Sequence, residues 1–114
     1  ELLKHIDGIS FTEYSDENSY FLFQIIIDKL IDRDKVLLGL KKNGIGVSIH
    51  YATPVPLMSY YKKKYGYITE DFPNAVHYGD QSISLPVHAM LSDEDIKHVC
   101  STLIKLLEMN YYET

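Results

Sequence analysis

The stretch YFLFQIII, residues 20–27, decides the predicted fold class of this chain. Its aromatic and β-branched residues favour a strand over a buried helix of the same length, and strands covered on both faces have this pattern. Before it, ISFTEY at 9–14 alternates apolar and polar residues and predicts a half-buried strand, and SDENS at 15–19 predicts a polar turn. Two strands so close in sequence indicate antiparallel pairing.

The hydrophobic period then changes to that of a helix. Asp32 can cap this helix, and Asn43-Gly44 ends it in the left-handed conformation. Its predicted buried stripe consists of Val36, Leu37 and Leu40. Gly39 lies inside the helix at a cost of roughly 1 kcal/mol relative to alanine. Either it allows a close approach to the sheet, or it has no structural role.

The remaining segments predict short elements and one long helix. VSI at 47–49 predicts a strand, and residues 57–72 predict a helical turn followed by a loop. Residues 73–82 predict a short helix that starts at a proline. ISLP at 83–86 predicts a strand that ends at its proline. A final helix of about 17 residues starts at a capping box. The box consists of Ser92 and Asp95. The predicted buried face of the helix consists of Ile96, Val99, Cys100, Leu103, Leu106 and Leu107. The predicted fold is α+β, a small mainly antiparallel sheet covered by helices.

Length and composition restrict the class of protein. The 114 residues predict one domain, and 46% hydrophobic residues predict a folded one. The net charge of −5 argues against a nucleic-acid partner, and no apolar run is long enough to predict a membrane span. A single cysteine fits a reducing compartment, so a cytoplasmic location is expected. Residues 1–8 predict the end of a helix cut from something longer.

The sequence contains no complete catalytic or metal site. The five histidines lack metal-ligand spacing, no glycine-rich phosphate loop is present, and Cys100 on an apolar stripe predicts a buried structural thiol. Lys62–Lys64, interleaved with tyrosines, predict either a solvated loop or a nucleotide or phosphate contact.

The segment GVSIHYATPVP, residues 46–56, carries the most distinctive residue pair. His50 and Tyr51 follow a short strand, and Pro54 and Pro56 restrict the turn after them. Two interpretations remain open: a ring pair packed at the edge of a core, or a loop that directs both rings at a ligand.

Three segments together resemble the carboxy-terminal part of the DegT/DnrJ/EryC1/StrS sugar aminotransferases. They are KKNGIGVSIHYATPVPLMSYY at 41–61, YGYITEDFPNA at 65–75 and SISLPVHAMLSDEDIKHV at 82–99. The resemblance runs from about Tyr20 to Leu107. The family often has a histidine where Met58 stands, and a glutamate where Val76 stands.

The resemblance implies an enzyme that uses pyridoxal phosphate to aminate a nucleotide-linked keto sugar, as a cytoplasmic homodimer. The implied fold is the carboxy-terminal domain of fold-type I aminotransferases, with residues 1–114 as that single domain and residues 1–8 as the end of an inter-domain helix. The Schiff-base lysine and phosphate cup would belong to an amino-terminal large domain. No catalytic or cofactor-binding residue is assigned here; His50 and Tyr51 are implied to contact the sugar nucleotide, and the chain alone is expected to be inactive.

Two rival interpretations stay open. The chain could be a stand-alone, non-catalytic α+β binding or assembly module. It could also be a regulatory domain that binds a small molecule through the loop at residues 62–67.

Overall fold

The computed structural model describes residues 1–111 and shows a three-stranded antiparallel sheet of order β1-β2-β3. The strands are β1 Ile9–Phe11, β2 Phe23–Ile27 and β3 Ser82–Leu85. Ile9 pairs with Ile27, and Ile25 pairs with Ile83. The predicted α+β fold with a mainly antiparallel sheet is therefore confirmed, although β1 and β2 are shorter than the segments from which they were predicted.

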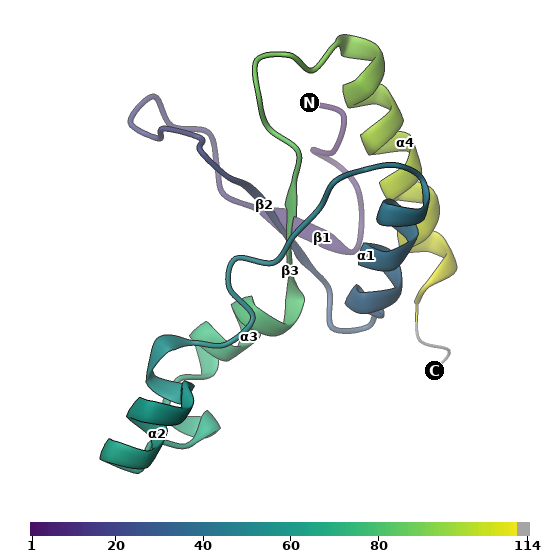
Figure 1. Cartoon of the computed structure of the whole chain (residues 1–114). Coiled ribbons are helices and arrows are strands. Elements are labelled where there is room, and N and C mark those ends of the chain that lie inside the picture. Colours follow the sequence, from purple (N-terminus) through teal and green to yellow (C-terminus); the bar gives the residue numbers. More distant parts are fainter. Residues whose placement is uncertain (112–114) are drawn as a thin grey trace.

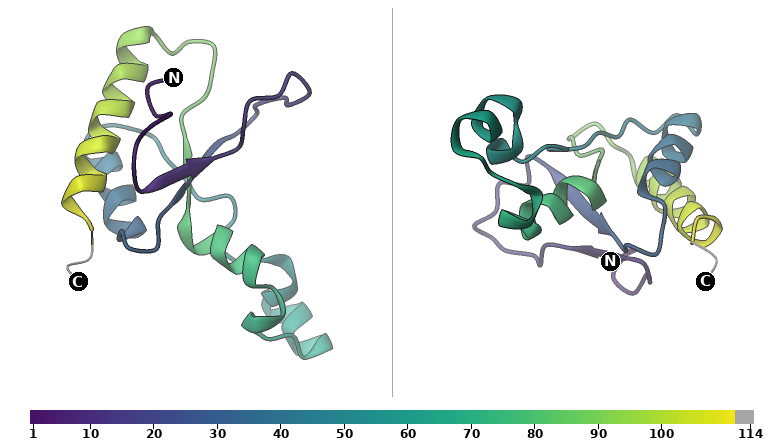
Figure 2. Two further views of the ribbon diagram at one scale, coloured as in Figure 1. Left: turned by 180° about the vertical axis from the view of Figure 1, so that it is seen from behind. Right: turned by 90° about the horizontal axis from the view of Figure 1, so that it is seen from below.

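The described residues also form four α-helices: α1 Arg33–Lys42, α2 Ser59–Tyr65, α3 Pro73–Gln81 and α4 Asp93–Met109. Two 3₁₀ turns, η1 Val55–Leu57 and η2 Thr69–Asp71, flank α2. Helices α1 and α4 lie side by side against the sheet, whereas α2 and α3 extend away from it (Figures 1 and 2). We call residues 55–81 the helical arm.

The core lies between one face of the sheet and the α1–α4 pair. Ile25, Ile27 and Ile83 of the sheet meet Leu40 of α1 and Leu103 of α4, and all five side chains are fully buried. The predicted stripe of α1 is confirmed as buried. Cys100 is also buried, and its burial raises the pKa of the thiol, as expected of a structural cysteine.

The expectation that residues 20–27 are covered on both faces is wrong. Only Ile25 and Ile27 are fully buried, whereas Gln24 and Ile26, which point to the other face, are half-buried. The reason is that α1 and α4 pack on one face only. The opposite face carries polar side chains that matter for the site described below.

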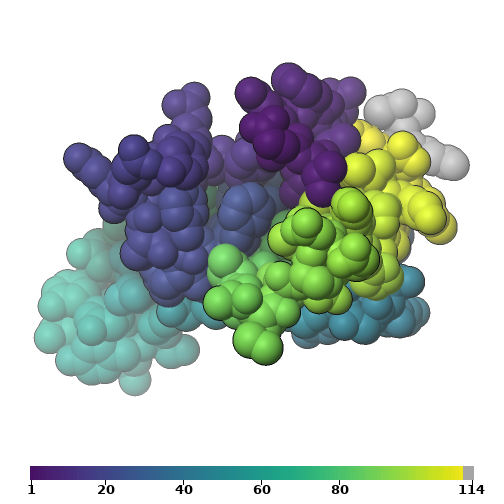
Figure 3. All heavy atoms as spheres, turned by 90° about the horizontal axis from the view of Figure 1, so that it is seen from above, coloured from purple at the N-terminus to yellow at the C-terminus, as the bar shows by residue number. Residues whose placement is uncertain are grey.

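Residues 1–8 contain hydrogen-bonded turns rather than the predicted helix end. The amides of Lys4 and Ile6 bond to the carbonyls of Glu1 and Leu3, three residues back, and no α-helix is assigned there. The short segment instead buries Leu3 in the core, and Figure 3 shows the first residues beside the spheres of α4. That these residues connect to a preceding domain stays a prediction.

The predicted strand at 47–49 is reduced to one bridge. Ser48 and Ser84 exchange two backbone hydrogen bonds at the free edge of β3, of 2.8 and 3.3 Å, and the chain then turns away. The segment 57–72, predicted as a helical turn followed by a loop, contains the helix α2 and the 3₁₀ turn η2.

Gly39 allows a close approach, but to a helix and not to the sheet. A Cβ built on Gly39 would meet the methyl groups of Leu106, so α1 packs tightly on α4 at this point. This contact replaces the approach to the sheet that the sequence suggested.

The capping box of α4 forms as predicted. Asp95 N–H donates to Ser92 Oγ at 3.1 Å, and Ser92 N–H donates to Asp95 Oδ2 at 2.9 Å. We expect Ser92→Ala to lower the free energy of unfolding by about 1 kcal/mol at neutral pH, measured by urea denaturation. Ser92→Thr keeps a cap and is the control; a loss as large as that of the alanine variant would contradict the assignment.

The same box makes stability depend on pH in a defined direction. Hydrogen bonds from the Ser92 backbone N–H and then its hydroxyl lower the pKa of Asp95 below its usual 3.8. This stabilisation is fully present above the unfolded-state value, and it is lost as the pH falls through the lower folded-state value.

Candidate functional site

His50 lies where the chain leaves the sheet, and three side chains hold it there. Its Nδ1 lies 2.8 Å from Ser84 Oγ and 3.4 Å from Ser48 Oγ, and Gln24 Nε2 donates to its backbone carbonyl. Gln24 pairs with Ser84 and Ser84 pairs with Ser48, so the three side chains share the sheet face opposite the core. The imidazole is thus fixed to a polar row across the sheet.

Tyr51 lies against His50 but faces solvent. The two rings meet edge to face with centroids 5.2 Å apart, and Tyr51 is 73% exposed whereas His50 is half-buried. The structure therefore brings the two predicted residues together in different settings. His50 is oriented by the sheet, and Tyr51 is free to meet a ligand or a protein surface.

The loop after this pair rests on the helical arm. A Cβ built on Gly79 of α3 would collide with the Ala52 carbonyl oxygen and lie 3.2 Å from the Tyr51 carbonyl oxygen. Only glycine leaves room for this backbone contact. We call residues 50–52 the His50 corner. Pro54 then stands at the N-cap of η1, and Pro56 lies within that turn.

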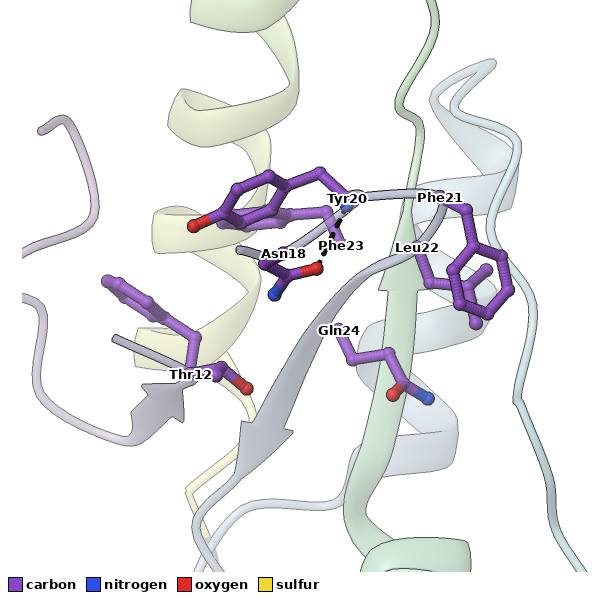
Figure 4. Close-up of a pocket in the computed structure, with 8 residues that line it drawn as sticks. Thr12, Asn18, Tyr20, Phe21, Leu22, Phe23 and Gln24 are labelled. Carbon is purple, nitrogen blue, oxygen red and sulfur yellow. Dashed lines mark hydrogen bonds between the residues drawn. The ribbon is translucent and has the colours of Figure 1, made fainter. Parts of the chain in front are cut away.

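Two hollows lie elsewhere on the surface. A hollow of about 180 Å³ at the base of the β1–β2 hairpin has Gln24 in its wall (Figure 4), and a second of about 390 Å³ lies between the loop after α1 and α4. Neither is lined by His50 or Tyr51. In Figure 4, Tyr20 and Phe21, which precede β2, point to opposite sides of the chain.

The lysine-tyrosine segment forms α2 and the turn after it. Lys64 Nζ lies 5.5 Å from the ring centre of Tyr60 and 5.3 Å from that of Tyr65. All residues of α2 are exposed. Lys64 thus already contacts aromatic faces of its own helix, which favours the solvated interpretation without testing the alternative.

Among residues 1–111 every lysine is exposed, and no group of metal-ligating side chains is present. A lysine that forms a Schiff base is activated by desolvation or by a neighbouring cation. Every lysine of this chain is exposed: Lys4, Lys29, Lys35, Lys41, Lys42, Lys62, Lys63, Lys64, Lys97 and Lys105. Within the same range, no three His, Cys, Asp or Glu side chains are grouped as metal ligands would be. No helix there is long and apolar enough to cross a bilayer.

Sequence reasoning missed Gln24 and Ser84, the two residues that hold His50 most closely. A signal for each existed. Gln24 is the one amide in an otherwise apolar and aromatic run, and Ser84 alternates with Ile83 and Leu85 in a strand whose four residues are all buried. Buried polar groups need partners, so both positions predict hydrogen bonds.

Comparison with protein families gives one match that spans most of the chain. The model described as the DegT/DnrJ/EryC1/StrS aminotransferase family matches residues 1–104. Spore coat polysaccharide biosynthesis protein SpsC of Bacillus subtilis is 32% identical over 93 residues, which are 78% of this chain and 24% of SpsC. The UDP-4-amino-4-deoxy-L-arabinose--oxoglutarate aminotransferase of Shewanella sediminis is 28% identical over 117 residues, 94% of this chain and 30% of that enzyme.

A solved structure agrees with these matches. The putative sugar aminotransferase Spr1654 of Streptococcus pneumoniae, in its PMP-form, superposes with a TM-score of 0.82 at 26% identity, over 95% of this chain and 28% of Spr1654. A PLP-form of the same protein superposes with a TM-score of 0.78 at 27% identity, over 90% of this chain and 27% of that one. The chain spans about a quarter of the length of the curated relatives it matches.

Proposed function

Because this chain belongs to the DegT/DnrJ/EryC1/StrS aminotransferase family, we propose that it is the carboxy-terminal domain of a sugar aminotransferase that uses pyridoxal phosphate. Its substrate in this proposal is a nucleotide-linked keto sugar, and its role is to supply a substrate-binding loop and contacts between domains. The observation that carries the proposal is the family match over residues 1–104. The Shewanella relative, named for an amino sugar linked to UDP, supports the substrate class.

The cofactor in this proposal is held by protein outside this chain. Pyridoxal phosphate, when bound, supplies the electron sink through which an amino group is moved. All ten lysines are exposed, which supports the proposal that another part of the enzyme binds the cofactor. The residues of this chain then act on the sugar nucleotide alone.

His50 is the residue we propose for contact with the sugar nucleotide, with Tyr51 beside it. Ser84 occupies the Nδ1 side of the imidazole, so Nε2 is the atom left for a sugar or phosphate oxygen. Among residues 1–111 no hydrogen-bond partner of His50 Nε2 is found. A ring already fixed to the sheet loses little conformational entropy when a ligand binds.

The exposed surface of the chain supports the proposed protein partners, a large domain of the same enzyme and a second subunit. The radius of gyration is 15.6 Å, whereas a compact domain of this length has about 13 Å. The helical arm projects from the body with Tyr60, Tyr65 and Ile68 each more than half exposed. Apolar surface of this kind is typical of a contact with further protein. We place this assembly in the cytoplasm.

We predict that the chain by itself forms no specific lysine adduct with pyridoxal phosphate and transfers no amino group. Exposed lysines react weakly and without selectivity, because none of them is desolvated. Borohydride reduction followed by peptide mass spectrometry should find scattered, substoichiometric labelling. Stoichiometric labelling of a single lysine would contradict the proposal that the cofactor is held elsewhere.

Activity of the full-length enzyme tests the proposed substrate class. With glutamate as amino donor, we expect transfer to a nucleotide-linked keto sugar in preference to the same keto sugar without its nucleotide. Free 2-oxo acids serve as the comparison acceptors. Equal or better transfer to those acids would overturn the substrate assignment and favour the alternative that this chain has no sugar-binding role.

A further inference from the structure

The far end of α3, next to the His50 corner, is held by a residue from another helix. Arg33, the first residue of α1, donates from Nη1 to the carbonyl oxygens of Gly79 at 3.1 Å and Ser82 at 3.0 Å. Its Nε donates to Asp34 at 2.7 Å. The Arg33 side chain is only 12% exposed, so its guanidinium group interacts mainly with protein atoms and little with solvent.

Electrostatics explain why an arginine stands there. The last carbonyl groups of a helix carry partial negative charge and lack partners within the helix. The last turn of α3 contains no basic residue of its own. Arg33 therefore supplies both the positive charge and the donors that this helix end needs, and it joins the end of α3 to the start of β3.

The same helix end supports the His50 corner. Gly79, whose carbonyl accepts from Arg33, is also the residue on which the backbone of Tyr51 and Ala52 rests without space for a Cβ. A shift of α3 at this residue must therefore move Ala52 and, two peptide bonds away, His50. The Ser84 hydroxyl and the Gln24 amide hold His50 from the sheet, and Arg33 acts from the other side through α3.

We infer that Arg33 is a positioning residue for substrate binding: through Gly79 it fixes the backbone of residues 51–52 and so the direction of His50. The inference rests on the proposed function of His50. Arg33 touches no substrate in this account, and its effect on the sugar nucleotide passes entirely through the corner. A displacement of about 1 Å at a binding residue is enough to cost up to about a hundredfold in rate.

A double-mutant cycle in the full-length enzyme tests this. Arg33→Met keeps the length and packing of the side chain but removes its donors, and we expect KM for the nucleotide-linked keto sugar to rise about tenfold. The half-reaction with the amino donor should stay unchanged. In a His50→Ala background, Arg33→Met should add less than about twofold, because the residue through which it acts is gone.

Two further variants serve as checks. Asp34→Asn removes the negative charge of the exposed Asp34 side chain and leaves the Arg33 contacts to α3 in place, so it should change neither KM nor kcat. Gly79→Ala improves the helix propensity of α3, but its Cβ would collide with the Ala52 carbonyl oxygen. It should therefore raise KM for the nucleotide-linked keto sugar, as Arg33→Met does, without unfolding the helix.

Each outcome decides a separate point. If Arg33→Met lowers both half-reactions equally, or adds its full effect to His50→Ala, Arg33 is only structural and the inference is overturned. If His50→Ala itself leaves the keto-sugar KM unchanged, the proposed role of His50 fails first and the inference falls with it. A tenfold effect of Arg33→Met that disappears in the His50→Ala background supports the inference.

Discussion

Replacement of His50 by alanine in the full-length enzyme should slow the half-reaction with the keto sugar and leave the half-reaction with the amino donor unchanged. In the proposed function the cofactor and the amino donor bind outside this chain, and His50 Nε2, on the side of the imidazole away from Ser84, contacts the sugar nucleotide. Loss of one such hydrogen bond should cost about 1–3 kcal/mol of transition-state stabilisation. Single-turnover kinetics of the two half-reactions measure each effect separately.

Two near-isosteric variants identify the atom that acts. Asn at position 50 can place its amide where Nδ1 lies and keep the contact to Ser84, whereas Gln reaches toward Nε2. We expect His50→Gln to retain more keto-sugar activity than His50→Asn. Equal loss in both half-reactions, tracking a lower melting temperature, would show that His50 is a packing residue only.

The largest expected effect on stability is at Leu103 of α4, which belongs to the hydrophobic core. Leu103 is completely buried, and Leu103→Ala should lower the free energy of unfolding by about 2–5 kcal/mol. Leucine and alanine have similar helix propensities, so the loss reports packing rather than helix formation. Urea denaturation and the shift in melting temperature measure it.

Met109→Ala is the matched control on the same helix. Met109 is 78% exposed, and its removal should change stability by less than about 0.5 kcal/mol. If Leu103→Ala were as mild as Met109→Ala, α4 would not be packed on the sheet as described.

The elements with strong local signals could be predicted from the sequence. Asp32 caps α1 by accepting from the Lys35 amide, Gly44 follows the helix at a φ of +75°, and Ser92 with Asp95 starts α4. Each signal acts within a few residues, through a side-chain cap or a backbone conformation that glycine adopts at low cost. Local chemistry of this kind is visible in sequence.

Features set by tertiary packing were predicted less well. Ile96 was placed on the buried face of α4 but is 42% exposed, because the sheet ends before it reaches the first turn of the helix. The strand expected at residues 47–49 shrinks to a single bridge at Ser48, since the edge of β3 offers it only two backbone hydrogen bonds before the chain turns. Periodicity cannot show how far a neighbouring element extends.

The candidate site also combines residues with a local sequence signal and contacts that depend on tertiary packing. The place of His50 and Tyr51 between a short strand and two prolines marks them as candidates, and their predicted role in binding comes from the family resemblance. The residues that fix His50 come from 26 and 34 positions away along the chain, and the contact between Gly79 and Ala52 joins α3 to the loop. Such contacts depend on how the sheet and the arm meet, and a single sequence does not show them.

A crystal structure of the full-length enzyme with a nucleotide-linked amino sugar bound tests the central claim most directly. We expect His50 Nε2 at about 2.7–3.2 Å from a sugar or phosphate oxygen, with Nδ1 still on Ser84 and the Ala52 carbonyl still against Gly79. A ligand seated in the active site with no atom near His50, its imidazole still held by the sheet, would contradict the claim that this corner recognises the sugar nucleotide.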